Sequence, residues 1–377
     1  MILSNVNIFS RDCVFENGAV EVEDGRIKQL IFDGQNVSGD VIDCKGQYLI
    51  PGLIDIHSHG CDGHDFCEGT KDAFDAITNY EIKNGVTSIC PATMTYPDEK
   101  LLPVMEAVST YENDKGAEIL GINMEGPFIS KDKVGAQNPK YVQKPNIDLL
   151  NKLNKASNNK IKLVDIAPEV EGAFDFIKKA AKEFVISVAH TNCDYQTAKK
   201  AYDLGAKHLT HIFNAMPPIL HRSPGPILAA SESGANAEII CDGQHVDYAA
   251  VRLAFELFEG SICLISDSCE ATGLADGQYS LGGQDIMKKG DKVVLKDSPD
   301  TIAASATNLF ECLKHAINDA GIDKNKAIAA ATINPAKAIG VDSLYGSIEP
   351  GKFADLLLVD ESFKLLAVYK KGIKSDS

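Results

Sequence analysis

The sequence predicts an α/β protein: a (β/α)₈ barrel of the TIM type with a small discontinuous β-sandwich domain made from both ends of the chain. Three observations indicate this fold. Eight apolar runs alternate with amphipathic stretches through the middle of the chain, short alternating strands fill the first 48 residues, and a strand pattern returns from residue 346. Strands covered by helices on both faces read as nearly continuous apolar runs, which is typical of parallel βα units.

The eight apolar runs lie between residues 48 and 268. They are YLIPGLIDIHSH, TSICPATM, ILGINMEG, IKLVDIAP, FVISVAHT, HLTHIFNAM, AEIICDGQH and SICLISDS. Stretches such as 71–85 and 195–207 have helical periodicity and end near a glycine that can cap a helix, whereas the connection after the sixth run is less regular. Two more helical patterns follow the last run, around 305–320 and 323–339.

The length of the chain fits this fold. A barrel of this kind uses about 250 residues, so a chain of 377 residues has room for an accessory domain. We expect residues 1–48 and 346–377 to form one small β domain and residues 49–345 to form the catalytic barrel.

Composition excludes several classes of function. The formal net charge of −16 disfavours nucleic acid and anionic membranes as partners, because both require a basic surface. No run of about 18 uncharged residues is present, and the N-terminus lacks a signal-peptide pattern. The ten cysteines are scattered without a CxxC pair, which predicts reduced, mostly buried thiols and a cytoplasmic location.

Polar residues at the ends of the predicted strands give the strongest functional signal. They are His57 and His59 after the first run, Glu125 after the third, His190 after the fifth, His211 after the sixth and Asp267 after the eighth. The carboxyl ends of barrel strands form the face that holds the active site. An HxH pair alone could be accidental, but two residues apart on a strand both imidazoles point to one side. Together the six residues predict a divalent metal site of the zinc, iron or manganese type rather than calcium.

Asp267 has an additional expected role. A carboxylate on the last strand can take a proton from an attacking water and return it to a leaving amine, which amide hydrolysis requires. Asp267 could instead be a plain metal ligand or a helix cap, and the ligand and base roles can coexist. His208 lies three positions before His211 and should point to the opposite side of its strand, so we interpret it as structural.

The pattern of ligands resembles the amidohydrolase superfamily. Over essentially the whole chain, the finer motifs PGLIDIHSHG, MEGPFIS, VAHT, THIFNAM, the following HR, DGQHVD and SDS are similar to the N-acetylglucosamine-6-phosphate deacetylase family. The resemblance implies a metal-dependent hydrolase that converts N-acetyl-D-glucosamine 6-phosphate to D-glucosamine 6-phosphate and acetate in amino-sugar catabolism or recycling. It implies one or two divalent metal ions per subunit, of zinc, iron, manganese or cobalt.

The resemblance also implies roles for individual residues. Glu125, His190 and His211 match the ligands of the main metal, Asp267 matches the catalytic acid and base, and His57 and His59 match a pair that allows a second metal bridged by Glu125. For the substrate, it places the backbone of Asn214 and Ala215 near the sugar phosphate, His245 in the pocket, and Arg222 in the site of a neighbouring subunit of a homodimer. An arginine offers bidentate donors that stay charged, which allows an acidic protein to bind a dianion.

Two segments depart from the family pattern. Ile302, Ala303 and Ala304 fall where relatives have a loop lining the sugar site, with Ala304 in place of the usual glycine. In the GAQNP segment, Gln137 stands where many relatives carry a histidine that hydrogen-bonds the acetyl carbonyl, and Ala136 beside it is expected to line the substrate site. A glutamine amide can still donate to an oxyanion but cannot carry charge.

Three other functions compete with this interpretation. The same chemistry on N-acetylgalactosamine 6-phosphate changes one hydroxyl of the substrate, and acetate release from both sugars separates the two. Another amidohydrolase, such as a dihydroorotase or deaminase, would share only the metal scaffold, and the EGPF and GQHVD motifs argue against it. A metal-stabilised sugar-phosphate sensor without turnover would be revealed by metal content together with a turnover assay.

Overall fold

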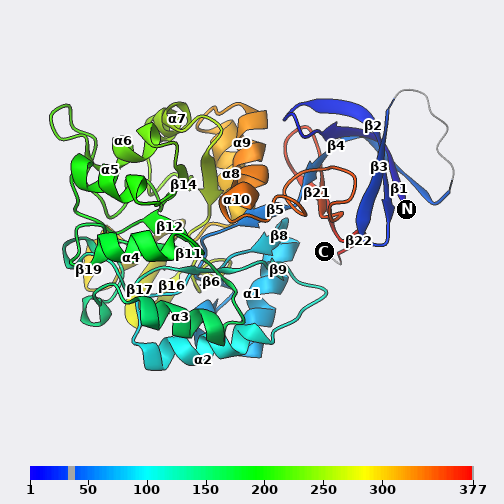
Figure 1. The fold of residues 1–377 in the computed structure, drawn as a ribbon. Coiled ribbons are helices and arrows are strands. Elements are labelled where there is room, and N and C mark those ends of the chain that lie inside the picture. Colours follow the sequence, from blue (N-terminus) through cyan, green and yellow to red (C-terminus); the bar gives the residue numbers. More distant parts are fainter. Residues whose placement is uncertain (33–38, 376–377) are drawn as a thin grey trace.

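The structure is a computed structural model that describes residues 1–32 and 39–375. Figure 1 shows a barrel surrounded by helices and, beside it, a β domain that holds both ends of the chain. The barrel strands are β5 (Leu53–Asp55), β8 (Val86–Ile89), β9 (Glu118–Ile119), β10 (Ile122–Met124), β11 (Ile161–Ile166), β12 (Val185–Val188), β13 (His208–Leu209), β14 (Asn236–Ile240) and β15 (Ile262–Ile265). They coincide with the eight predicted runs, the third of which overlaps β9 and contains β10.

Parallel hydrogen bonding closes the barrel. The strands form two sheets, in the orders β5-β8-β9 and β10 through β15, and a parallel bridge between Ala92 and Asn123 joins them. After the last strand, the main-chain N–H of Asp267 donates to the carbonyl of His57 at 2.9 Å, which brings the end of β15 back to the end of β5. The predicted (β/α)₈ architecture is therefore confirmed.

Helices connect and cover the barrel strands. They are α1 (Lys71–Lys83), α2 (Asp98–Ser109), α3 (Ile147–Ala156), α4 (Ala173–Ala180), α5 (Tyr195–Asp203), α6 (Gly225–Glu232), α7 (Tyr248–Leu257), α8 (Leu309–Asn318), α9 (Lys324–Ala331) and α10 (Ile333–Ala338). The side chain of Thr70 accepts from the third residue of α1, and Asp194 does the same for α5. Gly85 follows α1 with a φ of 82°, the left-handed conformation expected of a helix-ending glycine.

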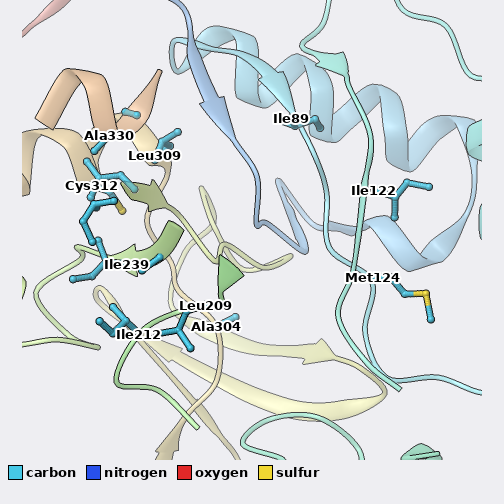
Figure 2. Packing of buried hydrophobic residues seen from close by; sticks show 14 of the residues in the cluster. Ile89, Ile122, Met124, Leu209, Ile212, Ile239, Ala304, Leu309, Cys312 and Ala330 are labelled. Carbon is cyan, nitrogen blue, oxygen red and sulfur yellow. The ribbon is translucent and has the colours of Figure 1, made fainter. Parts of the chain in front are cut away.

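The core lies between the barrel strands and the surrounding helices. Figure 2 shows part of it: strand residues Ile89, Ile122 and Ile239 belong to the same buried cluster as Leu309 and Cys312 of α8. Burying an aliphatic side chain of this size stabilises the fold by about 1.5–3 kcal/mol. Packing on both faces explains why the barrel strands read as continuous apolar runs.

The small β domain combines both termini, as predicted. Its strands are β1 (Ile2–Phe9), β2 (Phe15–Glu23), β3 (Arg26–Phe32), β4 (Val41–Pro51), β20 (Leu356–Val359), β21 (Leu365–Lys370) and β22 (Ile373–Lys374), which form one seven-stranded sheet. The chain ends meet where β20 pairs antiparallel with β4, with Leu356 opposite Pro51. Apolar side chains from both ends share one core. The domain bounds 1–48, 49–345 and 346–377 stay a prediction.

A four-stranded antiparallel sheet between β15 and α8 was not predicted. It consists of β16 (Gly277–Leu281), β17 (Gln284–Lys289), β18 (Lys292–Leu295) and β19 (Ser298–Ile302). Shorter elements are β6 (Gly60–Cys61), β7 (His64–Asp65) and the 3₁₀ turns η1 (Phe66–Glu68), η2 (Lys131–Lys133) and η3 (Pro139–Tyr141). The tight turn at Gly282 and Gly283, both with positive φ, is the signal that could have indicated a hairpin here.

Two properties of the whole chain follow from composition. All ten cysteines are free, and all except Cys13 are buried, which agrees with the predicted thiols. Across residues 1–32 and 39–375, no helix has the length and apolar character needed to cross a membrane.

The start of the first barrel strand gives a stability prediction. A Cβ added at Gly52 would lie 2.1 Å from Oγ1 and 2.4 Å from Cγ2 of Thr87, a buried β-branched residue that cannot move aside. We expect Gly52→Ala to lower the free energy of unfolding by about 1–3 kcal/mol through overpacking. Gly277→Ala is the control, because its nearest heavy atom would lie at 3.6 Å. Denaturant unfolding of both variants tests this, and equal stabilities would contradict it.

Candidate metal and substrate site

The predicted polar residues meet at one end of the barrel. They follow their strands directly: His57 and His59 after β5, Glu125 after β10, His190 after β12, His211 after β13 and Asp267 after β15. All six are buried. His190, His211 and Asp267 have φ values of 41°, 25° and 49°, a left-handed backbone that is unfavourable for residues other than glycine. Such conformations concentrate at functional sites, where the surrounding structure holds them.

The carboxylate of Glu125 is the centre of the site. Its Oε1 lies 3.0 Å from Nε2 of His190, 3.2 Å from Nε2 of His211 and 3.5 Å from Nε2 of His57. Its Oε2 lies 3.3 Å from Nε2 of His59. Ligand atoms of Glu125, His190 and His211 form one group within 4.8 Å of one another, and those of Glu125, His57 and His59 form a second.

The hydrogen bonds around these rings fit a bound cation. Nδ1 of His190 lies 2.8 Å from the carbonyl of Lys133, which can only accept, so Nδ1 carries the hydrogen. In the neutral ring Nε2 then offers a lone pair toward Glu125 and lies 3.1 Å from Nε2 of His211. Lone pairs that face one another in a buried site repel unless a cation lies between them. The donor set therefore fits a divalent metal ion.

His57 is held from behind by Glu238. Nδ1 of His57 lies 2.9 Å from Oε2 of Glu238, and both side chains are fully buried. Oε1 of Glu238 lies 3.0 Å from Nε2 of His208, and His208 belongs to neither group of possible ligands. Burial favours the neutral acid, but His57 and His208 outweigh it and lower the pKa of Glu238 to about 2. Glu238 is thus an ionised carboxylate next to the ligand group.

Asp267 lies beside both histidines of the HxH pair. Its Oδ1 is 3.3 Å from Nε2 of His59 and 3.8 Å from Nε2 of His57. Burial opposes ionisation, but these two imidazoles outweigh it and hold the pKa of Asp267 below its usual value. Burial likewise lowers the pKa of His59, and the carboxylates of Asp267 and Glu125 outweigh it, raising that pKa to about 10. These shifts leave Asp267 and Glu125 ionised, so both carboxylates can offer charged oxygens to a cation in place of the imidazole proton.

A cavity of about 310 Å³ opens onto this cluster. Its lining comprises His59, Met94, Glu125, Gly135, Ala136, Gln137, His190, His211, Phe213, Asn214, Ala215, His245, Asp267, Leu281, Asp300, Thr301, Ile302 and Ala304. Most predicted substrate residues are among them. Ala303 is not, because it is fully buried and its N–H donates to the carbonyl of Val293. Arg222 is exposed and does not line the cavity of its own chain.

Gln137 is more constrained than the sequence indicated. Its Oε1 accepts from the main-chain N–H of Thr95 at 2.7 Å, and its Nε2 donates to Oε2 of Glu125. One amide hydrogen is therefore committed to orienting the carboxylate of Glu125, and Nε2 also lies 3.8 Å from Sδ of Met94, a weak acceptor that a substrate oxygen could replace.

One main-chain N–H group of the loop that contains Asn214 and Ala215 is already used in a hydrogen bond within the chain. The main-chain N–H of Asn214 donates to the carbonyl of His211 at 3.0 Å, so this amide helps to hold the loop. Phe213 and Ala215, on either side, have positive φ values of 76° and 51°. Left-handed residues in a loop turn neighbouring N–H groups toward a common point, an arrangement that favours anions.

Sequence reasoning missed several residues that shape the site. Asp242 holds His245, with Oδ2 lying 2.7 Å from Nδ1 of the ring. Burial would lower the pKa of His245, but the bond to Asp242 raises it. Asp300, Thr301 and Leu281 reach the cavity from the unpredicted β16–β19 sheet. An acid inside an apolar run, as in AEIICDGQH for Glu238, is the signal that could have found the supporting carboxylates.

The fold and site together define a metal-dependent amidohydrolase, and comparison with known proteins agrees. Residues 48–374 match the Amidohydrolase family, and the chain belongs to that family. The N-acetylglucosamine-6-phosphate deacetylase of Bacillus subtilis (strain 168) is 32% identical, over 99% of this chain and 96% of its own length. The N-acetylgalactosamine-6-phosphate deacetylase of Escherichia coli O157:H7 is 30% identical, over 88% of this chain and 89% of its own.

A solved structure is similar over the whole chain. It is a mutant of the N-acetyl-D-glucosamine-6-phosphate deacetylase from Mycobacterium smegmatis in complex with N-acetyl-D-glucosamine-6-phosphate. The two structures superpose with a TM-score of 0.93 at 28% identity, covering 100% of this chain and 99% of the other.

Ala304 yields a prediction about backbone strain. Its φ is 55°, where a Cβ is unfavourable and glycine is not. Ala304→Gly loses the stability contributed by a methyl group and makes the unfolded chain more flexible, but it also relieves this backbone strain, which offsets part of the loss in stability. We expect this variant to be at least about 1 kcal/mol more stable than Ala303→Gly, which loses a buried methyl without such relief. Denaturant unfolding measures the difference, and a larger loss for Ala304→Gly would be inconsistent with strain.

Proposed function

We propose that this chain hydrolyses the acetamide of N-acetyl-D-glucosamine 6-phosphate, giving D-glucosamine 6-phosphate and acetate in amino-sugar catabolism or recycling. The observation that carries the proposal is the convergence of Glu125, His190 and His211 at a cavity that also contains Asp267 and His245. Similarity over nearly the full length to proteins named for this reaction supports it.

The ligand residues would hold one or two divalent ions. Glu125, His190 and His211 would hold the main ion, and His57 and His59 with Glu125 a second, to which Asp267 would contribute. Such an ion lowers the pKa of a water molecule and polarises the acetamide carbonyl. Zinc, iron, manganese and cobalt all accept imidazole and carboxylate ligands.

Asp267 would move the proton. Its carboxylate takes the proton of the attacking water and then protonates the amide nitrogen as the carbon–nitrogen bond breaks. His245, fixed by Asp242, would present Nε2 to the substrate, and the remaining amide hydrogen of Gln137 would donate to the oxygen on which charge develops. Ala136, Ile302 and Ala304 would line the sugar pocket, with Ala303 supporting the loop from behind.

Arg222 would bind the phosphate from a neighbouring subunit of a homodimer. Among the described residues that line the cavity there is no lysine or arginine, whereas Glu125, Asp267 and Asp300 are acidic. A dianion bound here requires a cation from outside this chain's own lining. The Asn214 and Ala215 loop would complete the phosphate site.

The buried free thiols bear on where in the cell the protein is located. We propose a cytoplasmic enzyme, supported by ten free cysteines of which nine are buried.

Substrate identity is tested by measuring acetate release from N-acetylglucosamine 6-phosphate and N-acetylgalactosamine 6-phosphate side by side, with metal analysis of the same protein. The second sugar is a specific alternative because a relative of similar identity is named for it. Faster turnover of the galacto epimer would transfer the proposal to that substrate. A metal-loaded protein without turnover on either would indicate a sensor.

Replacing Asp267 tests its proton-transfer role. We expect Asp267→Asn to reduce kcat by about 10²–10⁴ while the ion held by Glu125, His190 and His211 is retained. Asp285→Asn, on the exposed side of β17, is the control and should keep the wild-type rate. Steady-state kinetics with metal analysis decide the matter, and near-normal turnover in Asp267→Asn would remove this residue from the reaction.

Replacing Arg222 tests phosphate binding. A charge-assisted hydrogen bond contributes about 1.5–3 kcal/mol, so we expect Arg222→Ala to raise KM for the phosphorylated sugar about 10–100-fold. KM for unphosphorylated N-acetylglucosamine should not change. Arg11→Ala, an exposed arginine of the β domain, is the control.

Mixing two variants shows whether Arg222 acts in the site of its own chain or in the site of the neighbouring subunit. If Arg222 acts in trans, dimers of one Arg222→Ala chain and one Asp267→Asn chain contain one complete site, so random mixing restores about a quarter of all sites. If Arg222 acts within its own chain, mixing restores nothing.

A further inference from the structure

We propose that Glu238 is a positioning residue that selectively builds the second metal site, by fixing the tautomer of His57. The inference rests on the proposed function, because it assumes that the ligand cluster binds metal. It assigns a role to a residue that is neither a ligand nor part of the cavity lining.

The geometry around Glu238 determines which nitrogen of His57 carries a hydrogen. Oε2 of Glu238 lies 2.9 Å from Nδ1 of His57 and also accepts from the main-chain N–H of His211, so this oxygen serves as a hydrogen-bond acceptor. Nδ1 is therefore the donor, and in the neutral ring that binds a metal ion the lone pair of Nε2 is directed at Glu125 and Asp267. A carboxylate behind a metal-ligating histidine sets its tautomer, orients the ring and increases its basicity.

Glu238 is itself held rigidly. Oε1 of Glu238 lies 3.0 Å from Nε2 of His208, and Oε2 accepts a hydrogen bond from the main-chain N–H of His211 at 3.3 Å. Both imidazole contacts and the carboxylate are fully buried, so water cannot replace any partner. The carboxylate consequently has little freedom to turn away from His57.

The two proposed metal positions depend on Glu238 unequally. His190, a ligand of the main site, has its own Nδ1 partner in the carbonyl of Lys133, and its Nε2 faces Glu125 and His211. His211 donates to Glu238 with its main-chain N–H, whereas Nε2 of its ring faces Glu125 and His190. His57 of the second site has its ring fixed by Glu238. Replacing Glu238 should therefore lower the metal affinity of the second site much more than that of the first.

Metal titration of the full chain tests this. Apoprotein is titrated with Zn²⁺ by equilibrium dialysis and elemental analysis, using wild type, Glu238→Gln and Asp165→Asn. The amide removes the charge and offers one acceptor to two imidazoles, so we expect second-site affinity to fall about 10–100-fold and first-site affinity to change less than about threefold. Asp165→Asn is the matched control: this barrel carboxylate is fully buried and accepts from Thr210. It should leave both affinities unchanged.

A double-mutant cycle separates positioning from general loss of structure. If Glu238 acts through His57, adding Glu238→Gln to His57→Asn should change Zn²⁺ binding no further. Equal weakening of both sites by Glu238→Gln, no weakening of either, or a wild type that binds a single ion would overturn the proposal.

The wild-type protein provides a measurement that does not depend on folding of a variant. Ring nitrogen chemical shifts of ¹⁵N-histidine in the Zn²⁺-loaded chain report the tautomer of His57, assigned with His57→Asn. A hydrogen on Nδ1 supports the proposal, and one on Nε2 overturns it. Acetate release from the same preparations keeps the two proposals apart. Selective loss of the second ion in a chain without turnover would overturn the proposed function alone.

Discussion

The structure depends on one electrostatic constraint, the meeting of four imidazoles around the buried carboxylate of Glu125. Moving such a group out of water costs several kcal/mol unless partners compensate for its lost hydration. The partners come from strands β5, β12 and β13, so the contacts form only when the barrel closes in the correct register. Binding of a metal ion at this cluster would consequently be coupled to folding, because these side chains gather in the folded chain alone.

Several acidic side chains are buried inside the barrel in addition to those of the site. Barrel interiors are usually filled by Val, Ile and Leu, but Asp55, Asp165 and Glu238 are fully buried here. Oδ1 of Asp55 accepts the main-chain N–H of His57 at 3.1 Å and that of Ser266 at 3.4 Å, which links the first strand to the last. Asp55 therefore helps to define where the chain turns after the first and the last barrel strands.

The sequence predicted most of the fold and the ligand set for one physical reason. Burial on both faces produces apolar runs, and ligands directly after such runs are visible as local patterns. The residues that hold these side chains in place cannot be recognised in the sequence, because the contact between His57 and Glu238, for example, joins residues 181 positions apart. The commitment of Gln137 to Thr95 and Glu125 is equally a property of three-dimensional packing. The β16–β19 sheet escaped prediction because its short strands are largely exposed and lack an apolar run.

That sheet contributes part of the cavity lining from one contiguous segment of the chain. Among the described residues, its strands pair only with one another, yet Leu281, Asp300, Thr301 and Ile302 line the cavity. Nε2 of Gln284 donates to the carbonyl of Ala136, which also lines the cavity. The six polar residues proposed as metal ligands all lie outside this segment, at the ends of barrel strands. A single contiguous stretch can therefore change by insertion or replacement and alter the shape of the cavity, while the residues at the strand ends stay in place.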